Sequence, residues 1–178
     1  MRGSLLIANP AMRRSCLLVC LVLVLGVPSP AQVLYVPRDH HSIQTAIDAA
    51  LPGDTILVKE GTYFENIDFR GKALTLASYF ILDRDVSHIS RTIIDGSRAL
   101  DPARASVVTF DSGEDSTSVV CGFTITGGTG SYIPDVHTEQ SMKNWRNICG
   151  GGILMHRSGG KIIYNINTVF SAFNPLLN

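Results

Sequence analysis

The feature that most constrains this chain is a series of short β-branched runs separated by turn residues. A first run at 33–37 is followed by one short helical pattern, and then by further runs bounded by Gly, Asp, Asn or Ser; these lie at 55–58, 66–69, 74–78, 91–96, 106–110, 117–128, 151–155 and 160–166. This alternation of strand and turn signals is typical of an all-β chain. No helical pattern of about 10 to 15 residues separates the runs, so a repeated βαβ fold is disfavoured.

Two of the longer segments share an internal order. In 106–128 and again in 151–166, an apolar run is followed by a polar turn around Ser-Gly and a second apolar run. This repeated pattern favours a repeat architecture, whose units bury their apolar faces by stacking on one another. A sandwich of hairpins remains open, although Asp95-Gly96 is the only Asn-Gly or Asp-Gly pair. Within 117–128, period-two alternation predicts one face made of Val119, Cys121, Phe123 and Ile125.

The helical pattern lies at 43–51. Ser42 can cap its first turn, and Pro52-Gly53 ends it. Ile43, Ile47 and Ala50, with Ala46 and Leu51 beside them, form one apolar face. So short a helix needs packing to be stable, so we expect Ile47 to be buried and Gln44 to be exposed.

The first 31 residues have the three parts of a secretory signal peptide. Arg13 and Arg14 precede the apolar run 16–27, and Ser29-Pro30-Ala31 supplies small residues before a cut at Gln32. The run is shorter than the roughly 20 apolar residues of a membrane span, so no span is expected after cleavage. We therefore expect a secreted, cell-surface or periplasmic protein.

The ordered motifs carry a resemblance. They are "SIQTAIDAALPGDTILVKEGTYFENIDF", "GKALTLAS", "TIIDG" and "GFTITGG", followed by "GGGI" at 150–153. Residues 35–128 resemble the N-terminal part of secreted right-handed parallel β-helix proteins of the pectin-lyase-like superfamily. After the signal peptide at 1–31, the resemblance implies a strand and a capping α-helix at 32–54 and an incomplete set of β-helix coils at 55–178, truncated at the C-terminal end. In such folds the helix covers the open end of the coil stack.

The resemblance leaves function open, because this superfamily includes lyases, hydrolases, esterases, adhesins and binding domains. Polygalacturonase-type motifs are absent, and the paired aspartates and Arg of pectinesterases are not recognisable. The leading expectation is a non-catalytic β-helix domain that presents a polysaccharide-binding or adhesive face. The alternative is the N-terminal part of a polysaccharide lyase or pectinesterase-like enzyme whose catalytic coils are missing. A third reading is a truncated product without activity of its own.

One long polar segment, 129–149, is the candidate binding site. Aromatic side chains beside cationic ones suit stacking on a sugar ring, and long loops are often functional. The candidate substrate-binding residues are Tyr132, His137, Lys143, Trp145 and Arg146. The structural alternative is a loop that packs over the sheet, with Trp145 covering apolar surface.

No catalytic residue, metal site or cofactor is predicted. Asp83 and Asp85 fit a solvated turn better than a catalytic pair, and His40 and His41 have no third ligand at a recognisable spacing. Cys121 and Cys149 remain after cleavage, and whether they are bridged is open.

The balance of charge bears on partners. The segment 1–31 carries three arginines and no acid, which leaves 12 basic and 15 acidic residues and a net charge of −3. This balance disfavours nucleic acid as a partner. The apolar segment 160–178 is poor in charges, so self-association through an open C-terminal end is also expected.

Export should leave a mature N-terminus at or near Gln32. Mass spectrometry of the secreted protein measures this directly. Intact Met1 or Met12 on protein that fractionates with membranes would contradict the signal-peptide interpretation.

Overall fold

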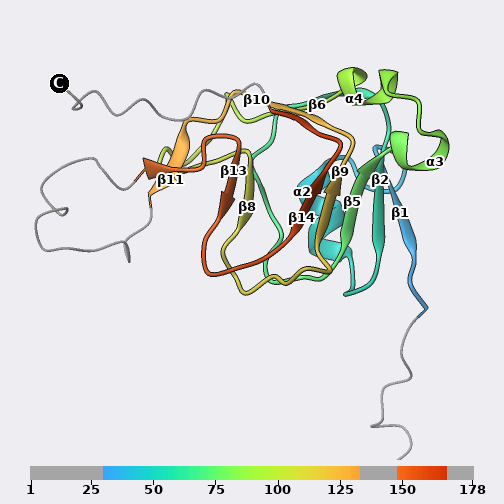
Figure 1. Ribbon diagram of the computed structural model, residues 1–178, viewed down its shortest axis with the longest axis horizontal. Helices are drawn as coiled ribbons and strands as arrows, with labels where there is room; N and C mark the ends of the chain where they lie inside the picture. The colour runs from blue at the N-terminus through green and yellow to red at the C-terminus, as the bar shows by residue number, and fades with distance from the viewer. Residues whose placement is uncertain (1–29, 133–147, 168–178) are drawn as a thin grey trace, which may run out of the picture. The chain divides into compact units, whose positions relative to one another are not determined.

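Parallel strands dominate the computed structural model, which describes residues 30–132 and 148–167 (Figure 1). The longest sheet has the order β1 (Val33–Val36), β2 (Thr55–Val58), β5 (Thr75–Ser78), β9 (Val119–Cys121) and β14 (Lys161–Ile163). A second parallel sheet has the order β15 (Ile166–Asn167), β10 (Thr124–Thr126), β6 (Thr92–Asp95) and β3 (Gly61–Tyr63). The third has the order β13 (Ile153–Met155), β8 (Val108–Phe110) and β4 (Ile67–Asp68).

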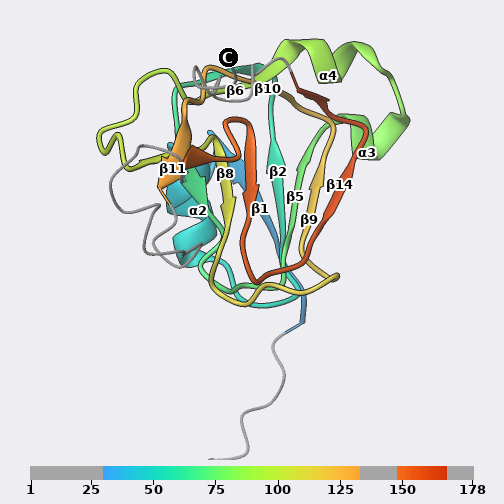
Figure 2. The same cartoon turned by 60° about the vertical axis from the view of Figure 1, so that its left-hand side comes forward.

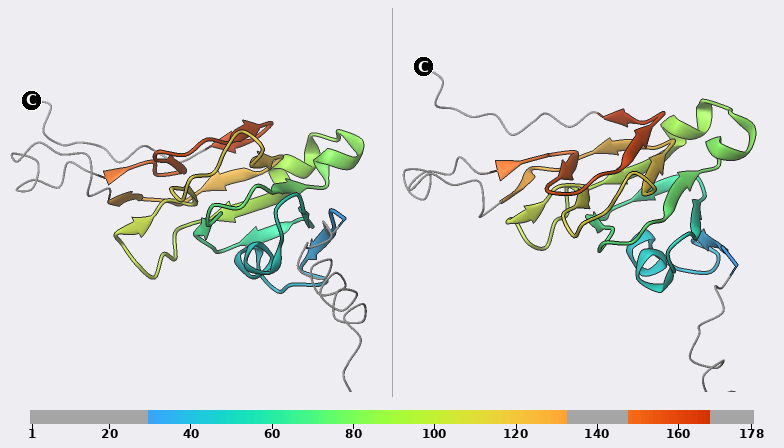
Figure 3. Two further views of the ribbon diagram at one scale, coloured as in Figure 1. Left: turned by 90° about the horizontal axis from the view of Figure 1, so that it is seen from below. Right: turned by 60° about the horizontal axis from the view of Figure 1, so that its bottom comes forward.

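The chain visits these three sheets in a repeating order. β2, β3 and β4 form a first coil; β5, β6 and β8 form a second; β9, β10 and β13 form a third; β14 and β15 begin a fourth. The coils follow one another in chain order in both views of Figure 3. Equivalent residues stack in register, as Ile56, Leu76, Val120 and Ile162 do. The described residues thus form short parallel sheets with three helices, an arrangement compatible with a β-helix.

The core lies between the parallel sheets. Ile56, Leu76 and Val120 are completely buried in it, and the rings of Phe69 and Phe110 lie 4.4 Å apart. Burying an apolar side chain of this size contributes about 1.5–3 kcal/mol to the free energy of unfolding. The stack formed by Ile56, Leu76 and Val120 is therefore a main source of stability.

Glycine lets neighbouring coils approach at one corner. The Cα of Gly128 lies 3.4 Å from the point where a Cβ on Gly96 would stand. A Cβ on Gly128 itself would lie 1.9 Å from the backbone oxygen of Gly151. No side chain fits there, which explains why "DG", "GG" and "GGG" recur at this corner of successive coils.

A helix covers the first coil. α2 (Ile43–Ala49) is capped at its N-terminus by Ser42, whose hydroxyl accepts a hydrogen bond from the Thr45 amide. Ile43, Ala46 and Ile47 are fully buried in the core, so the predicted burial of Ile47 is confirmed. α2 also connects two parallel strands, β1 and β2, although it is shorter than the helices of a repeated βαβ fold.

Polar groups of the first coil hold both ends of α2. The carboxylate of Glu65 accepts hydrogen bonds from the amides of Ile43 and Gln44, both at 2.9 Å. At the other end, Lys72 Nζ donates to the carbonyls of Ile47, Asp48 and Ala50 at 2.7–2.9 Å. Each charge has the sign that its helix terminus attracts.

The expected exposure of Gln44 is wrong. Its side chain is half-buried and pairs with the backbone of Asp68: the Asp68 amide donates to Gln44 Oε1 at 2.8 Å, and Gln44 Nε2 donates to the Asp68 carbonyl at 3.2 Å. β4 has a neighbouring strand on one side only, β8. On the free edge of β4, the side-chain amide of Gln44 therefore makes the hydrogen bonds that a neighbouring strand would make.

The alternation predicted for 117–128 is also only partly correct. Gly122, with φ of +83°, lies between β9 and β10 and turns the chain there. Side chains after this turn therefore do not continue the alternation of those before it. Phe123 and Ile125 enter the main core, whereas Cys121 packs in a second, outer cluster. A continuous strand would have kept these side chains on one face.

Several elements were not predicted. The exposed segment around Asp83 and Asp85 forms two short helices, α3 (Phe80–Asp83) and α4 (Ser87–Arg91). An antiparallel sheet of β12 (Ile148–Cys149), β11 (Gly130–Tyr132) and β7 (Arg104–Ala105) lies outside the parallel sheets.

Some expectations fall on residues that the structure does not describe. The signal peptide lies outside the described residues except for Pro30 and Ala31, and so does the C-terminal segment from 168 onward. In the last described coil, Ile162, Ile163 and Tyr164 are exposed. Self-association there stays a prediction.

Ile47→Asp should lower the free energy of unfolding by about 3–5 kcal/mol, because the new carboxylate would be buried without a partner. Ala49→Asp places the same side chain on the exposed side of α2 and should change it by no more than about 1 kcal/mol. Thermal or denaturant unfolding measures both. Equal effects would mean that α2 does not cover a core.

Candidate functional site

A groove of ≈ 390 Å³ lies between the start of α2, the first coil and the loop after β6. The lining combines aromatic, cationic, acidic and amide side chains. Its residues are Gln44, Phe64, Glu65, Asn66, Ile67, Asp68, Arg70, Arg98, Leu100, Asp101, Arg104, Ser106 and Thr109. The stacking of coils therefore brings together segments that are far apart in the sequence.

Local turns shape the wall formed by residues 96–104. Asp95 Oδ1 accepts a hydrogen bond from the Ser97 amide at 2.9 Å, and Asp101 Oδ1 accepts one from the Ala103 amide at 2.8 Å. Such Asx turns fix short loops through the side chain of their first residue. They place Arg98 and Arg104 at opposite ends of one loop.

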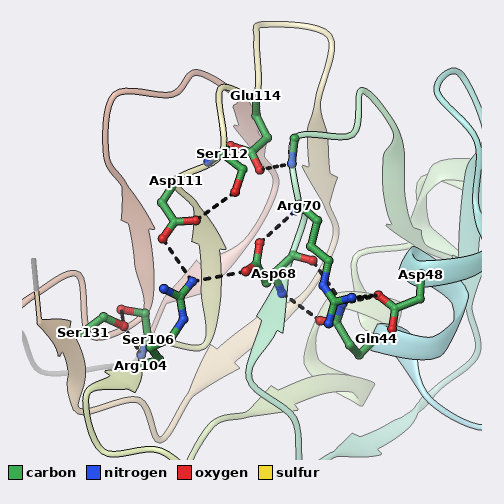
Figure 4. Close-up of polar contacts among 11 residues, drawn as sticks. Gln44, Asp48, Asp68, Arg70, Arg104, Ser106, Asp111, Ser112, Glu114 and Ser131 are labelled. Atoms are coloured by element: carbon green, nitrogen blue, oxygen red, sulfur yellow. Dashed lines mark hydrogen bonds and ion pairs between the residues drawn. The ribbon is translucent and has the colours of Figure 1, made fainter.

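Arg104 joins two carboxylates at one side of the groove (Figure 4). One terminal nitrogen lies 3.2 Å from Asp68 Oδ2 and 3.0 Å from Asp111 Oδ2. Partial burial lowers the pKa of Arg104, but the neighbouring charges of Asp111 and Asp68 raise it by more. The two aspartates therefore share one permanent cation.

The aspartates have further partners. Asp68 Oδ1 accepts a hydrogen bond from the Arg70 amide at 2.8 Å, and Asp111 Oδ1 accepts one from the Ser112 hydroxyl at 3.2 Å. The guanidinium of Arg70 points away from Asp68 and pairs with Asp48 on α2 at 3.1 Å (Figure 4). Arg70 and Arg104 are thus both neutralised by carboxylates.

Arg98 is different. Its guanidinium carbon lies 3.6 Å from the centre of the Phe64 ring, which is 44 % exposed. Across residues 30–132 and 148–167, no carboxylate lies within ion-pair distance of Arg98. Stacking on an aromatic face orients a guanidinium and leaves its edge free to donate hydrogen bonds. Within the described part of the chain, the groove therefore offers an aromatic surface beside a cation that pairs with no carboxylate.

The structure describes one of the five predicted binding residues. Tyr132 is 49 % exposed at the end of β11, and its amide donates to the Ala103 carbonyl at 2.7 Å, beside Arg104. His137, Lys143, Trp145 and Arg146 lie outside the described residues. Tyr132 thus lies beside the loop that forms one wall of the groove, and the role of the predicted binding residues stays a prediction.

The sequence reasoning missed Phe64, Arg98 and Arg104. Two arginines within 95–104 were a local signal, but that loop lacks the length that drew attention to 129–149. Phe64 belongs to another coil, and only the stacking of the coils places it under Arg98.

Comparison with known proteins gives no family: no protein-family model, curated protein or solved structure matches the chain. Among the described residues, no group of three or more His, Cys, Asp and Glu side chains is arranged to hold a metal ion. In the same part of the chain, every helix is too short or too polar to cross a membrane.

Proposed function

We propose that this chain is a secreted or cell-surface domain with a right-handed parallel β-helix fold, and that it binds polysaccharide without cleaving it. Three parallel sheets visited in a repeating order support the fold. Right-handedness is the rule for connections between parallel strands of one sheet. The resemblance of residues 35–128 to the pectin-lyase-like superfamily agrees with this fold, and the signal-peptide pattern at 1–31 supports export.

The stack of Arg98 on Phe64 is the observation that carries the binding proposal. An exposed ring and a planar guanidinium together present a flat surface on which a sugar ring can lie. The free edge of the guanidinium can donate two parallel hydrogen bonds to a carboxylate or to neighbouring oxygens of the sugar. A groove that is open at the surface admits an extended chain.

Asp68 and Asp111 support a second candidate, a glycan-cleaving or ester-cleaving enzyme. Asp68 lines the groove, and Asp111 lies on the other side of Arg104 from it; acid–base cleavage of a glycan uses two carboxylates near each other. Here each carboxylate is paired with Arg104 and also accepts a second hydrogen bond from the loop around it. These contacts suit a role in shaping the groove, so binding without cleavage is the preferred function.

Binding should depend on both members of the stack. Arg98→Ala and Phe64→Ala should each weaken binding about 5- to 30-fold, which corresponds to about 1–2 kcal/mol. Titration calorimetry with oligogalacturonate, oligoalginate and a neutral glucan oligosaccharide measures this and finds the preferred class of sugar.

Arg38→Ala is the matched control, because Arg38 stacks on Tyr35 at 3.7 Å outside the groove lining. It should leave binding unchanged. An equal loss in all three variants, or no binding of any sugar by the wild-type chain, would overturn the proposal.

The wild-type chain should show no turnover of pectin, alginate or chondroitin. Assays for unsaturated uronate absorbance, reducing ends and released methanol cover lyase, hydrolase and esterase chemistry. Reproducible turnover that disappears in Asp68→Asn or Asp111→Asn would establish the enzyme instead. Turnover that both variants retain would exclude these aspartates but would still contradict a non-catalytic domain.

A further inference from the structure

The segment 79–91, which contains α3 and α4, covers part of the outer face of the longest sheet (Figures 1 and 2). Phe80 and Ile89 pack there against Ala77 of β5 and Cys121 of β9, in a cluster separate from the main core. Cys121 is a free thiol and is 1 % exposed. Burial raises the pKa of this thiol, more than the charge of Arg84 lowers it. Covered in this way, Cys121 is an unreactive thiol.

Ring contacts and two hydrogen bonds hold this cover in place. The Phe80 ring lies 5.0 Å from the Tyr164 ring of the last described coil, and the Arg84 guanidinium lies 5.6 Å and 5.9 Å from these two rings. The Phe80 amide donates to Ser78 Oγ at 3.3 Å, and Thr124 Oγ1 donates to the Ile89 carbonyl at 2.9 Å. Gly122 permits the close approach, because a Cβ there would lie 3.0 Å from the Cβ of Phe80. Helices of four and five residues are not stable by themselves, so the cover depends on such anchors.

His88 is the anchor that titrates. Its Nδ1 lies 2.6 Å from Glu60 Oε1, on the chain just before β3, and its Nε2 lies 3.1 Å from Asp83 Oδ2, on α3. The side chain is only 13 % exposed. A neutral imidazole has one N–H, so both contacts are hydrogen bonds only when the ring is doubly protonated. The imidazolium therefore joins the cover to the first coil.

We propose that segment 79–91 is a pH-sensitive cover, locked over Cys121 by the protonated His88 held between Asp83 and Glu60. Other charged and titratable groups also face this cluster. Asp85 adds negative charge, the Tyr79 ring lies edge-on to His88, and Arg91 pairs with Glu60 at 2.8 Å. The ion pair between Arg91 and Glu60 also joins the cover to the first coil; the two side chains are 51 % and 33 % exposed, and pairs that solvent reaches in this way contribute little to stability.

The direction of the pH effect follows from the contacts. The hydrogen bond to Asp83 raises the pKa of His88, burial opposes the rise, and the hydrogen bond to Glu60 adds to it. A group whose pKa is higher in the closed state stabilises that state fully below its ordinary value of about 6.5. This stabilisation is lost as the pH rises through the raised pKa. The cover therefore opens on the alkaline side, and Cys121 becomes reactive.

Alkylation of Cys121 by iodoacetamide tests the lock. The rate at Cys121 in the native full chain is followed by mass spectrometry from about pH 5.5 to about pH 8.5 and divided by the rate of an unstructured cysteine peptide at each pH. In the wild-type chain this ratio should rise several-fold with pH. In His88→Gln it should be high at every pH, and in His88→Lys, which keeps a positive charge, it should stay low at alkaline pH. His41→Gln, at an exposed histidine outside the cluster, should match the wild type.

Three results would overturn the proposal. One is a ratio that does not change with pH in the wild-type chain, and another is a His88→Lys variant whose ratio rises with pH as the wild type's does. The third is loss of hydrogen-exchange protection in β2 together with labelling, because that would be global unfolding. If His88→Gln fails to fold, the pH dependence of the alkylation ratio in the wild-type chain and in His88→Lys still tests the proposal.

Discussion

The contact between α2 and the first coil is the constraint on which the other coils depend. A stack of parallel coils must begin somewhere, and its first coil exposes an apolar interior and a strand edge. Ile43, Ala46 and Ile47 fill the interior, while the side chain of Gln44 pairs with the free edge of β4. The same contact places Gln44 and Asp68 in the groove, so the start of the fold and the candidate site share residues.

Most carboxylates of the described residues accept hydrogen bonds from backbone amides. Glu65 holds the first amides of α2, Asp54 accepts from the amides of Gln32 and Leu51, and Glu114 accepts from those of Gly71 and Ser112. Such charge-assisted bonds fix the connections between successive elements. None of the described carboxylates forms an ion pair with Arg98, so among the described residues the groove presents a cation.

The strands and the helix that depend on a local sequence pattern were predicted from the sequence. The short β-branched runs between turn residues located β2, β5, β6 and β8, and the sequence around Ser42 located α2. The features that the sequence did not predict depend on contacts between coils or on a single turn. The partner of Gln44 is 24 residues away in the sequence, and the turn at Gly122 reverses faces within an apolar run that looks continuous. The groove was missed for the same reason, since Phe64 and Arg98 belong to different coils. Of the predicted binding residues, only Tyr132 could be placed.

Native-state hydrogen exchange tests most directly whether α2 is an integral end of the stack. The amides to compare are Asp68, bonded to Gln44 Oε1, Ala50, bonded to the Ala46 carbonyl, and Val119, bonded to the Leu74 carbonyl. If α2 closes the first coil, all three should open with the same free energy, within about 1 kcal/mol, because they belong to one cooperative unit. Exchange of Asp68 and Ala50 at a much lower opening free energy than Val119 would show that α2 is a separate surface helix and would contradict the account.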